Sequence, residues 1–259
     1  MNDLVEVRSV NKAFGKLERN VLDNVSLSIK ENTILGFLGE TGSGKTTLAK
    51  IIVGLENPDS GTVYLKGSKL LGLKKRSFSQ CSEIQYIFQD PYSAMESYFT
   101  VEDILLEPFI ICKKNKHISL SPKQALKMVG INDYAIWKNK KISTLSGGQR
   151  QKICIARALI PNPKLIIADE STSMLDKEST NEILKIFKEL KKNNKLSLLL
   201  ISHQLNVVME ICDEICVLKN GEIIEHDKKD DVINRPKNRY TKKILDSMNF
   251  FMEDEYKYE

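Results

Sequence analysis

Three features that would place the chain in other protein classes are missing from its sequence. The five cysteines form no C-x-x-C pair, and their odd number is typical of reduced, mostly buried thiols rather than a disulfide framework. No apolar run approaches the roughly 18 residues that span a bilayer. The first six residues lack the basic and apolar regions of a signal peptide. We therefore expect a globular protein that stays in the cytosol and works at a membrane only where another chain holds it.

The net charge of +5 is modest and is spread along 259 residues. Lysine gathers at residues 113–116 and 138–141, where it could contact nucleic acid or anionic lipid. Short lysine runs are more often solvated surface, so they do not by themselves indicate a nucleic-acid partner.

The most informative stretch of the sequence is residues 34–48, where an apolar segment leads into a glycine-rich loop and then a helix. Residues 39–46 fit the pattern G-x-x-x-x-G-K-[ST] at every fixed position. Glycines let successive backbone N–H groups curl around a phosphate, and the N-terminus of the following helix adds its positive dipole end. Lys45 supplies a full charge for the β- and γ-phosphates, and the Thr46 hydroxyl can ligate Mg²⁺. The stretch predicts a nucleoside triphosphate site.

Hydrophobic patterning predicts an α/β protein. The first third has short alternating segments typical of antiparallel strands, and later continuous apolar runs indicate buried parallel strands. Residues 100–141 have helical spacing and predict an inserted helical subdomain. We expect strands at residues 4–10, 25–29, 34–38, 62–65, 84–88, 165–168, 196–201, 215–218 and 222–224, and helices that end near 54 and span 148–160 and 178–192.

Two acidic residues follow the apolar run at 165–168. In open α/β sheets ligands bind at the carboxyl ends of the strands, so Asp169 can hold the Mg²⁺ that Thr46 also ligates. Glu170 is then placed to orient or deprotonate an attacking water. Adjacent acids after a strand are also common in solvated loops, and it is the upstream phosphate loop that favours the catalytic interpretation.

A second glycine-rich helix start lies at residues 145–149, Leu-Ser-Gly-Gly-Gln. By the same physics it is a second anion-binding N-terminus. This stretch matches the signature motif of the ATP-binding subunits of ABC transporters residue for residue, and the resemblance covers about residues 4 to 247. Residues 173–176 resemble the family's D-loop, with Met174 where alanine is usual.

The resemblance implies the roles of the individual residues. ATP would contact Phe14, Gly39, Glu40, Thr41, Gly42, Ser43, Gly44, Lys45, Thr46, Thr47, Ser146, Gly147, Gly148, Gln149 and Asp176; Mg²⁺ would be held by Thr46, Gln89 and Asp169; and Glu170, His203 and Gln89 would act in catalysis. Phe14 would stack on adenine, although it could instead be a core aromatic. His203 would contact the γ-phosphate, although a lone histidine after a strand is more often structural.

The implied fold is a P-loop NTPase core with an antiparallel β subdomain and an inserted α-helical subdomain. Residues 1–247 would be one ATP-binding domain, with residues 1–89 and 155–247 as the core and 90–154 as the helical subdomain. Residues 248–259 would form an acidic and aromatic tail.

The implied assembly is a head-to-tail pair, in which each ATP lies between the phosphate loop of one chain and the signature motif of the other. Closing and opening of the pair would be a ligand-driven population shift. We expect a heterodimer with another ATP-binding subunit, with a homodimer as the alternative. The pair would lie at the cytoplasmic face of the membrane on two permease subunits, fed by an extracytoplasmic binding protein, with no nucleic acid involved.

Residues 89–94 and 239–245 resemble the peptide and nickel importers of this family, which suggests peptides or metal chelates as cargo. Residues 95–97 and 142–144 and Asn238 depart from that branch. The competing class is a soluble ABC ATPase that acts on ribosomes or nucleic acid. An exporter subunit is a third reading, against which residues 89–94 argue.

Overall fold

The computed structural model describes residues 3–15, 20–90 and 95–255, with the backbone alone for residues 248–255. The chain forms two compact units: residues 1–75 together with 199–259 (the first unit), and residues 76–198 (the second unit). Residues 91–94 of the importer-like segment lie outside the described residues, as do the last four residues of the expected tail; residues 248–255 belong to a helix.

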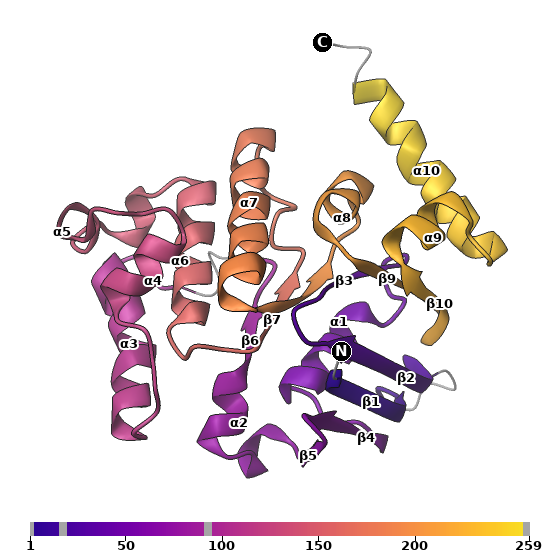
Figure 1. Cartoon of the computed structure of the whole chain (residues 1–259), viewed down its shortest axis with the longest axis horizontal. Helices are drawn as coiled ribbons and strands as arrows, with labels where there is room; N and C mark the ends of the chain where they lie inside the picture. The colour runs from indigo at the N-terminus through magenta and orange to yellow at the C-terminus, as the bar shows by residue number, and fades with distance from the viewer. Residues whose placement is uncertain (1–2, 16–19, 91–94, 256–259) are drawn as a thin grey trace. The chain divides into compact units, whose positions relative to one another are not determined.

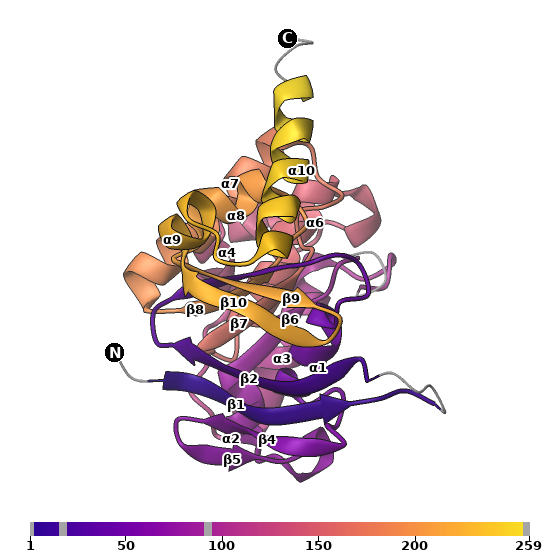
Figure 2. The same cartoon turned by 90° about the vertical axis from the view of Figure 1, so that its right-hand side faces the viewer.

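The first unit contains a four-stranded antiparallel sheet with the order β2-β1-β4-β5, whose strands lie side by side in Figure 2. Glu6 of β1 is paired with Ser28 of β2 on one side and with Tyr64 of β4 on the other. The antiparallel strands expected in the first third of the chain are thereby confirmed. The strands are β1 (Asp3–Lys12), β2 (Leu22–Lys30), β4 (Ser60–Leu65) and β5 (Ser68–Leu70).

The same unit contains β3 (Ile34–Leu38), which is buried along its whole length and runs parallel to β9 (Glu214–Lys219). β9 pairs antiparallel with β10 (Glu222–Lys228), which confirms the expected hairpin. Asn220 and Gly221 both have positive φ, 49° and 84°, as a two-residue type I′ turn requires. The helices of this unit are α1 (Lys45–Val53), η1 (Leu73–Lys75), α8 (Leu205–Ile211), α9 (Lys229–Asn234) and α10 (Arg239–Glu255) (Figure 1).

The second unit contains two parallel strands, β6 (Ile84–Ile87) and β7 (Leu165–Asp169), paired in register from Ile84 opposite Leu165. A further strand, β8 (Ser197–Ile201), begins in the second unit and ends in the first. The helices are α2 (Phe78–Glu83), α3 (Val101–Lys114), α4 (Pro122–Met128), α5 (Tyr134–Trp137), η2 (Ile142–Thr144), α6 (Gly147–Leu159) and α7 (Lys177–Asn194).

Helix α2 was not predicted from the sequence. Its start carries a capping box, in which the Ser77 hydroxyl accepts from the Gln80 N–H and the Gln80 side chain accepts from the Ser77 N–H. Ser-x-x-Gln is a recognisable helix-start signal. This signal is present at Ser77 and Gln80 and is enough to predict the start of the helix.

None of the five cysteines forms a disulfide, and all are buried except half-buried Cys81, in agreement with the reduced, mostly buried thiols that the sequence predicts. None of the helices in the described ranges is long and apolar enough to cross a membrane. The division expected from the sequence, at residues 89/90 and 154/155, stays a prediction; α6 continues unbroken through residue 154.

Candidate nucleotide site

The phosphate loop occupies the connection between β3 and α1 in the first unit. Gly44 caps α1 with φ 107°, and a Cβ at this position would lie 2.7 Å from both Leu22 Cδ2 and the Val21 carbonyl oxygen. Gly42 has φ 82° without such crowding, so there the backbone conformation, and not the space, requires glycine. The loop therefore has the left-handed turns with which backbone N–H groups can surround a phosphate.

Lys45 folds back over this loop and is 8% exposed. Its ammonium donates to the carbonyl oxygens of Gly39 and Glu40 at 2.7 and 2.8 Å and to the Ser43 hydroxyl at 3.3 Å. A full positive charge is thus held against the loop at a helix N-terminus, the kind of place where phosphate groups bind. Thr41 and Thr46 are exposed, and Thr47 is half-buried.

The start of α10 contacts the phosphate loop. The Glu40 N–H donates to the Tyr240 hydroxyl at 3.3 Å, and Lys219 Nζ lies 4.7 Å from the centre of the Tyr240 ring. Burial raises the pKa of Tyr240, which keeps its hydroxyl neutral. This contact was not predicted from the sequence, where Tyr240 is only part of the importer-like segment 239–245, because nothing local pairs residues 200 positions apart.

Phe14 and His203 are also in the first unit. Phe14 is 42% exposed, so it is no core aromatic, and Lys12 Nζ lies 5.0 Å from its ring centre. His203 is exposed and follows β8 by two residues. Both side chains are accessible for the nucleotide contacts predicted from the sequence.

In the second unit, two carboxylates at the end of β7, those of Asp169 and Glu170, each accept a hydrogen bond from a residue in or just after β6. The Tyr86 hydroxyl donates to Asp169 Oδ2 at 2.5 Å, and the Gln89 amide donates to Glu170 Oε2 at 2.7 Å. Asp169 is 5% exposed. Glu170 has φ 46°, a conformation that costs a residue with a side chain energy and that recurs at functional sites. Gln89 and Glu170, both predicted catalytic residues, are therefore in direct contact.

The signature motif forms the start of α6 in the same unit. The Ser146 hydroxyl accepts from the Gln149 N–H, and the Gln149 side chain accepts from the Ser146 N–H. Gly148 packs against Ser179, since a Cβ there would lie 2.6 Å from Ser179 Oγ.

Asp176 caps α7, where its carboxylate accepts from the Ser179 N–H at 2.8 Å and from the Ser179 hydroxyl at 2.9 Å. These two bonds lower the pKa of Asp176. The structure thus brings the signature motif and the D-loop aspartate together through one residue, Ser179.

Mg²⁺ fits the residues that the sequence proposes for it. Among the residues that the structure describes, no cluster of three or more His, Cys, Asp or Glu side chains could hold a metal by itself. Mg²⁺ usually takes one or two carboxylates, keeps several waters and binds substrate phosphates. The Thr46 hydroxyl in the first unit and the Asp169 carboxylate in the second are each a ligand of the kind that this binding mode uses.

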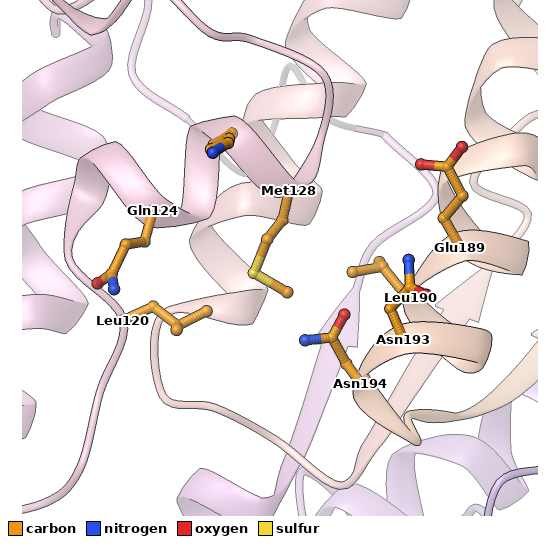
Figure 3. Close-up of a pocket in the computed structure, with 8 residues that line it drawn as sticks. Leu120, Gln124, Met128, Glu189, Leu190, Asn193 and Asn194 are labelled. Carbon is orange, nitrogen blue, oxygen red and sulfur yellow. The ribbon is translucent and has the colours of Figure 1, made fainter.

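A groove of about 390 Å³ in the second unit takes no part in this site. It lies between α4 and the C-terminal end of α7, and none of the predicted nucleotide residues lines it (Figure 3). Its lining consists of Leu120, Gln124, Lys127, Met128, Glu189, Leu190, Asn193 and Asn194.

Comparison with known proteins agrees with the motifs. The sequence profile of the ABC transporter family matches residues 22–173. The methionine import ATP-binding protein MetN of Bacillus subtilis (strain 168) is 36% identical over 93% of this chain and 71% of its own length. The oligopeptide transport ATP-binding protein OppF of Lactococcus lactis subsp. lactis (strain IL1403) is 38% identical over 91% of this chain and 75% of its own.

Among solved structures, the ATP-binding cassette MJ0796, in a dimeric post-hydrolysis state bound to ADP and Pi, is 28% identical. Its TM-score is 0.73, and the match covers 86% of this chain and 98% of that one. The expected α/β fold with a P-loop core is confirmed.

Proposed function

Because this chain belongs to the ABC transporter family, we propose that it is the ATP-hydrolysing subunit of an importer and uses the residues assigned above. Family membership makes it an ATPase that binds ATP with Mg²⁺. The observation that carries the proposal is the buried Lys45 ammonium held in a glycine loop at the start of α1, in a chain that also has the signature helix start at Ser146.

The phosphate loop binds and positions the triphosphate. Lys45 exchanges its carbonyl partners for phosphate oxygens and neutralises the charge that develops on them. The exposed Phe14 ring gives adenine a flat apolar surface. When bound, Mg²⁺ would supply further charge neutralisation, with Thr46 and Asp169 as its protein ligands.

Hydrolysis uses the carboxylate of Glu170. Glu170 accepts a proton from the attacking water, and the hydrogen bond from Gln89 holds its carboxylate in one orientation before the water arrives. His203 contacts the γ-phosphate as a hydrogen-bond donor. The amide nitrogen of Gln89 makes the bond to Glu170, so its amide oxygen would be a further ligand for Mg²⁺.

In this proposal two chains complete each site, and the phosphate lies between two helix N-termini, the loop at Lys45 of one chain and the signature at Ser146 of the other. MJ0796, which is similar to this chain, is a dimer in its post-hydrolysis state. We expect a heterodimer with a second ATP-binding subunit, bound at the cytoplasmic face of the membrane to two permeases and supplied by an extracytoplasmic binding protein.

The similarity to OppF supports a peptide as the cargo, and the similarity to MetN adds methionine as the competing cargo. Nickel or metal chelates rest on the resemblance of residues 89–94 and 239–245 alone.

The catalytic assignment is tested by Glu170→Gln. The amide keeps the size of the side chain but cannot accept the proton, so we expect turnover to fall about 10²- to 10⁴-fold while ATP binding persists. The variant should accumulate as an ATP-bound dimer, measured by size-exclusion chromatography with ATP. Wild-type turnover in this variant would remove Glu170 from the mechanism.

The transport role is tested by isolating the tagged chain from detergent-solubilised membranes and measuring its ATPase rate with and without the co-purified proteins. Recovery of two multi-span permeases and faster hydrolysis in their presence supports the importer. Recovery of ribosomes or nucleic acid, with hydrolysis indifferent to membranes, would keep the ATPase and replace the importer with the soluble class.

A further inference from the structure

The carboxylate proposed to hold Mg²⁺ has a hydrogen-bond donor that the motifs do not include. Tyr86, on β6, donates its hydroxyl to Asp169 Oδ2 at 2.5 Å. The distance is at the short end for an O–H donor to a carboxylate, where charge-assisted bonds are found. Both residues belong to the second unit.

The strand register explains how the two side chains meet. Tyr86 lies opposite Ile167 in the parallel pair of β6 and β7. Side chains alternate along a strand, so Ile167 and Asp169 share a face of the sheet with Tyr86. The phenol is long enough to reach from its own position to the residue that ends β7.

The surroundings keep Tyr86 a neutral donor. Burial, together with the hydrogen bond and the negative charge of Asp169, raises the pKa of Tyr86 far above its usual value. The ring also lies 4.8 Å from the ring of Phe88, centre to centre, which restricts its rotation. The hydroxyl is thus held in place on the carboxylate over the working pH range.

We propose that Tyr86 is a positioning residue that orients the Asp169 carboxylate for the Mg²⁺ of the bound nucleotide. Groups that hydrogen-bond to a metal ligand fix its orientation, and their loss typically costs 10- to 100-fold in metal affinity or activity. The proposal rests on the function proposed above, in which Asp169 is the metal ligand.

Tyr86→Phe removes one oxygen atom and leaves the ring. The full-length chain would be titrated with a non-hydrolysable ATP analogue, once in EDTA and once in excess Mg²⁺. The ratio of the two dissociation constants is the coupling between metal and nucleotide. In Tyr86→Phe we expect this ratio to shrink about 10-fold, with the affinity in EDTA unchanged.

Tyr134→Phe is the matched control. The Tyr134 hydroxyl donates to Glu102 Oε1 at 2.6 Å, and burial with that bond raises the pKa of Tyr134 to about 12. It is a second tyrosine–carboxylate bond of the same unit that involves none of the proposed nucleotide residues. Its removal should leave the coupling ratio at the wild-type value.

Asp169→Asn separates failure of this inference from failure of the proposed function. If Asp169→Asn lowers the ratio and Tyr86→Phe leaves it unchanged, Tyr86 is no positioning residue. If Asp169→Asn leaves the ratio unchanged, the metal role of Asp169 is wrong, and the inference falls with it. The proposal also requires Tyr86→Phe to add nothing in the Asp169→Asn background. Should Tyr86→Phe not fold, Tyr86→Met, which likewise lacks the donor, takes its place.

Discussion

The starts of α1 and α6 are both glycine-rich helix N-termini, but only the start of α6 has a side-chain cap. Gly44 caps α1 and has no side chain to accept a hydrogen bond. Ser146 caps α6 and forms a reciprocal capping box with Gln149. No cap side chain therefore competes with an anion at the start of α1, whereas an anion at α6 must compete with the side chains of Ser146 and Gln149.

The starts of α1 and α6 also differ in where a positively charged side chain lies. Lys45 holds its ammonium against two carbonyl oxygens of the loop before α1. Arg150, in the first turn of α6, donates instead to the carbonyl oxygens of Leu145 and Ser143 at 3.0 and 3.2 Å. We propose that the first N-terminus supplies affinity for the triphosphate, and that the second adds contacts only once a nucleotide is in place.

Among the variants that test this comparison of two helix starts, the largest effect should come from removing the charge that distinguishes α1. In Lys45→Ala the loop keeps its glycines but loses its ammonium, so we expect turnover to fall about 10²- to 10³-fold, together with weaker ATP binding. ATP hydrolysis and equilibrium nucleotide binding measure the two effects. Lys50→Ala, an exposed position in the last turn of the same helix, should behave as wild type. Near-normal hydrolysis in Lys45→Ala would mean that the backbone alone holds the phosphates.

The two glycines of the signature allow a test of how the start of α6 packs against its neighbours. In Gly148→Ala the new methyl group would lie 2.8 Å from Ser179 Cβ, and such overpacking costs about 1–3 kcal/mol of unfolding free energy. In Gly147→Ala the nearest atom is Leu175 Cδ2 at 3.4 Å, so this variant should fold with little change. Urea unfolding of both variants measures the difference. Equal stabilities would show that Ser179 moves aside without cost.

Sequence reasoning predicted those parts of the site that depend on residues close together in the chain. The phosphate loop, the signature at Ser146 and the hairpin turn at Asn220-Gly221 each carry their physical reason within a few positions. Their glycines and helix caps need particular backbone conformations, and such needs are visible in composition and spacing.

The contacts of Tyr86 and Tyr240 could not be predicted in the same way. Each joins segments that are far apart in sequence, 83 and 200 positions, and depends on strand register or on where α10 docks. Tyr86, in a strand, has the pattern of an ordinary half-buried residue, because no neighbouring residue in the sequence indicates which group its hydroxyl contacts. The capping box of α2 is the opposite case, since its Ser77 and Gln80 were readable and were missed.

The smallest expected effect separates the capping role of Ser146 from its role toward nucleotide. Ser146→Ala and Ser121→Ala both remove the serine of a Ser-x-x-Gln capping box, the second at the start of α4. Each loss of a cap costs about 1 kcal/mol of unfolding free energy, so the two variants should be destabilised alike in urea. Only Ser146→Ala should also lower ATP turnover, since only its hydroxyl belongs to the helix start that the second nucleotide contact would use. Equal turnover in the two variants would reduce Ser146 to a cap, and α6 would then contribute to the nucleotide site through its backbone alone.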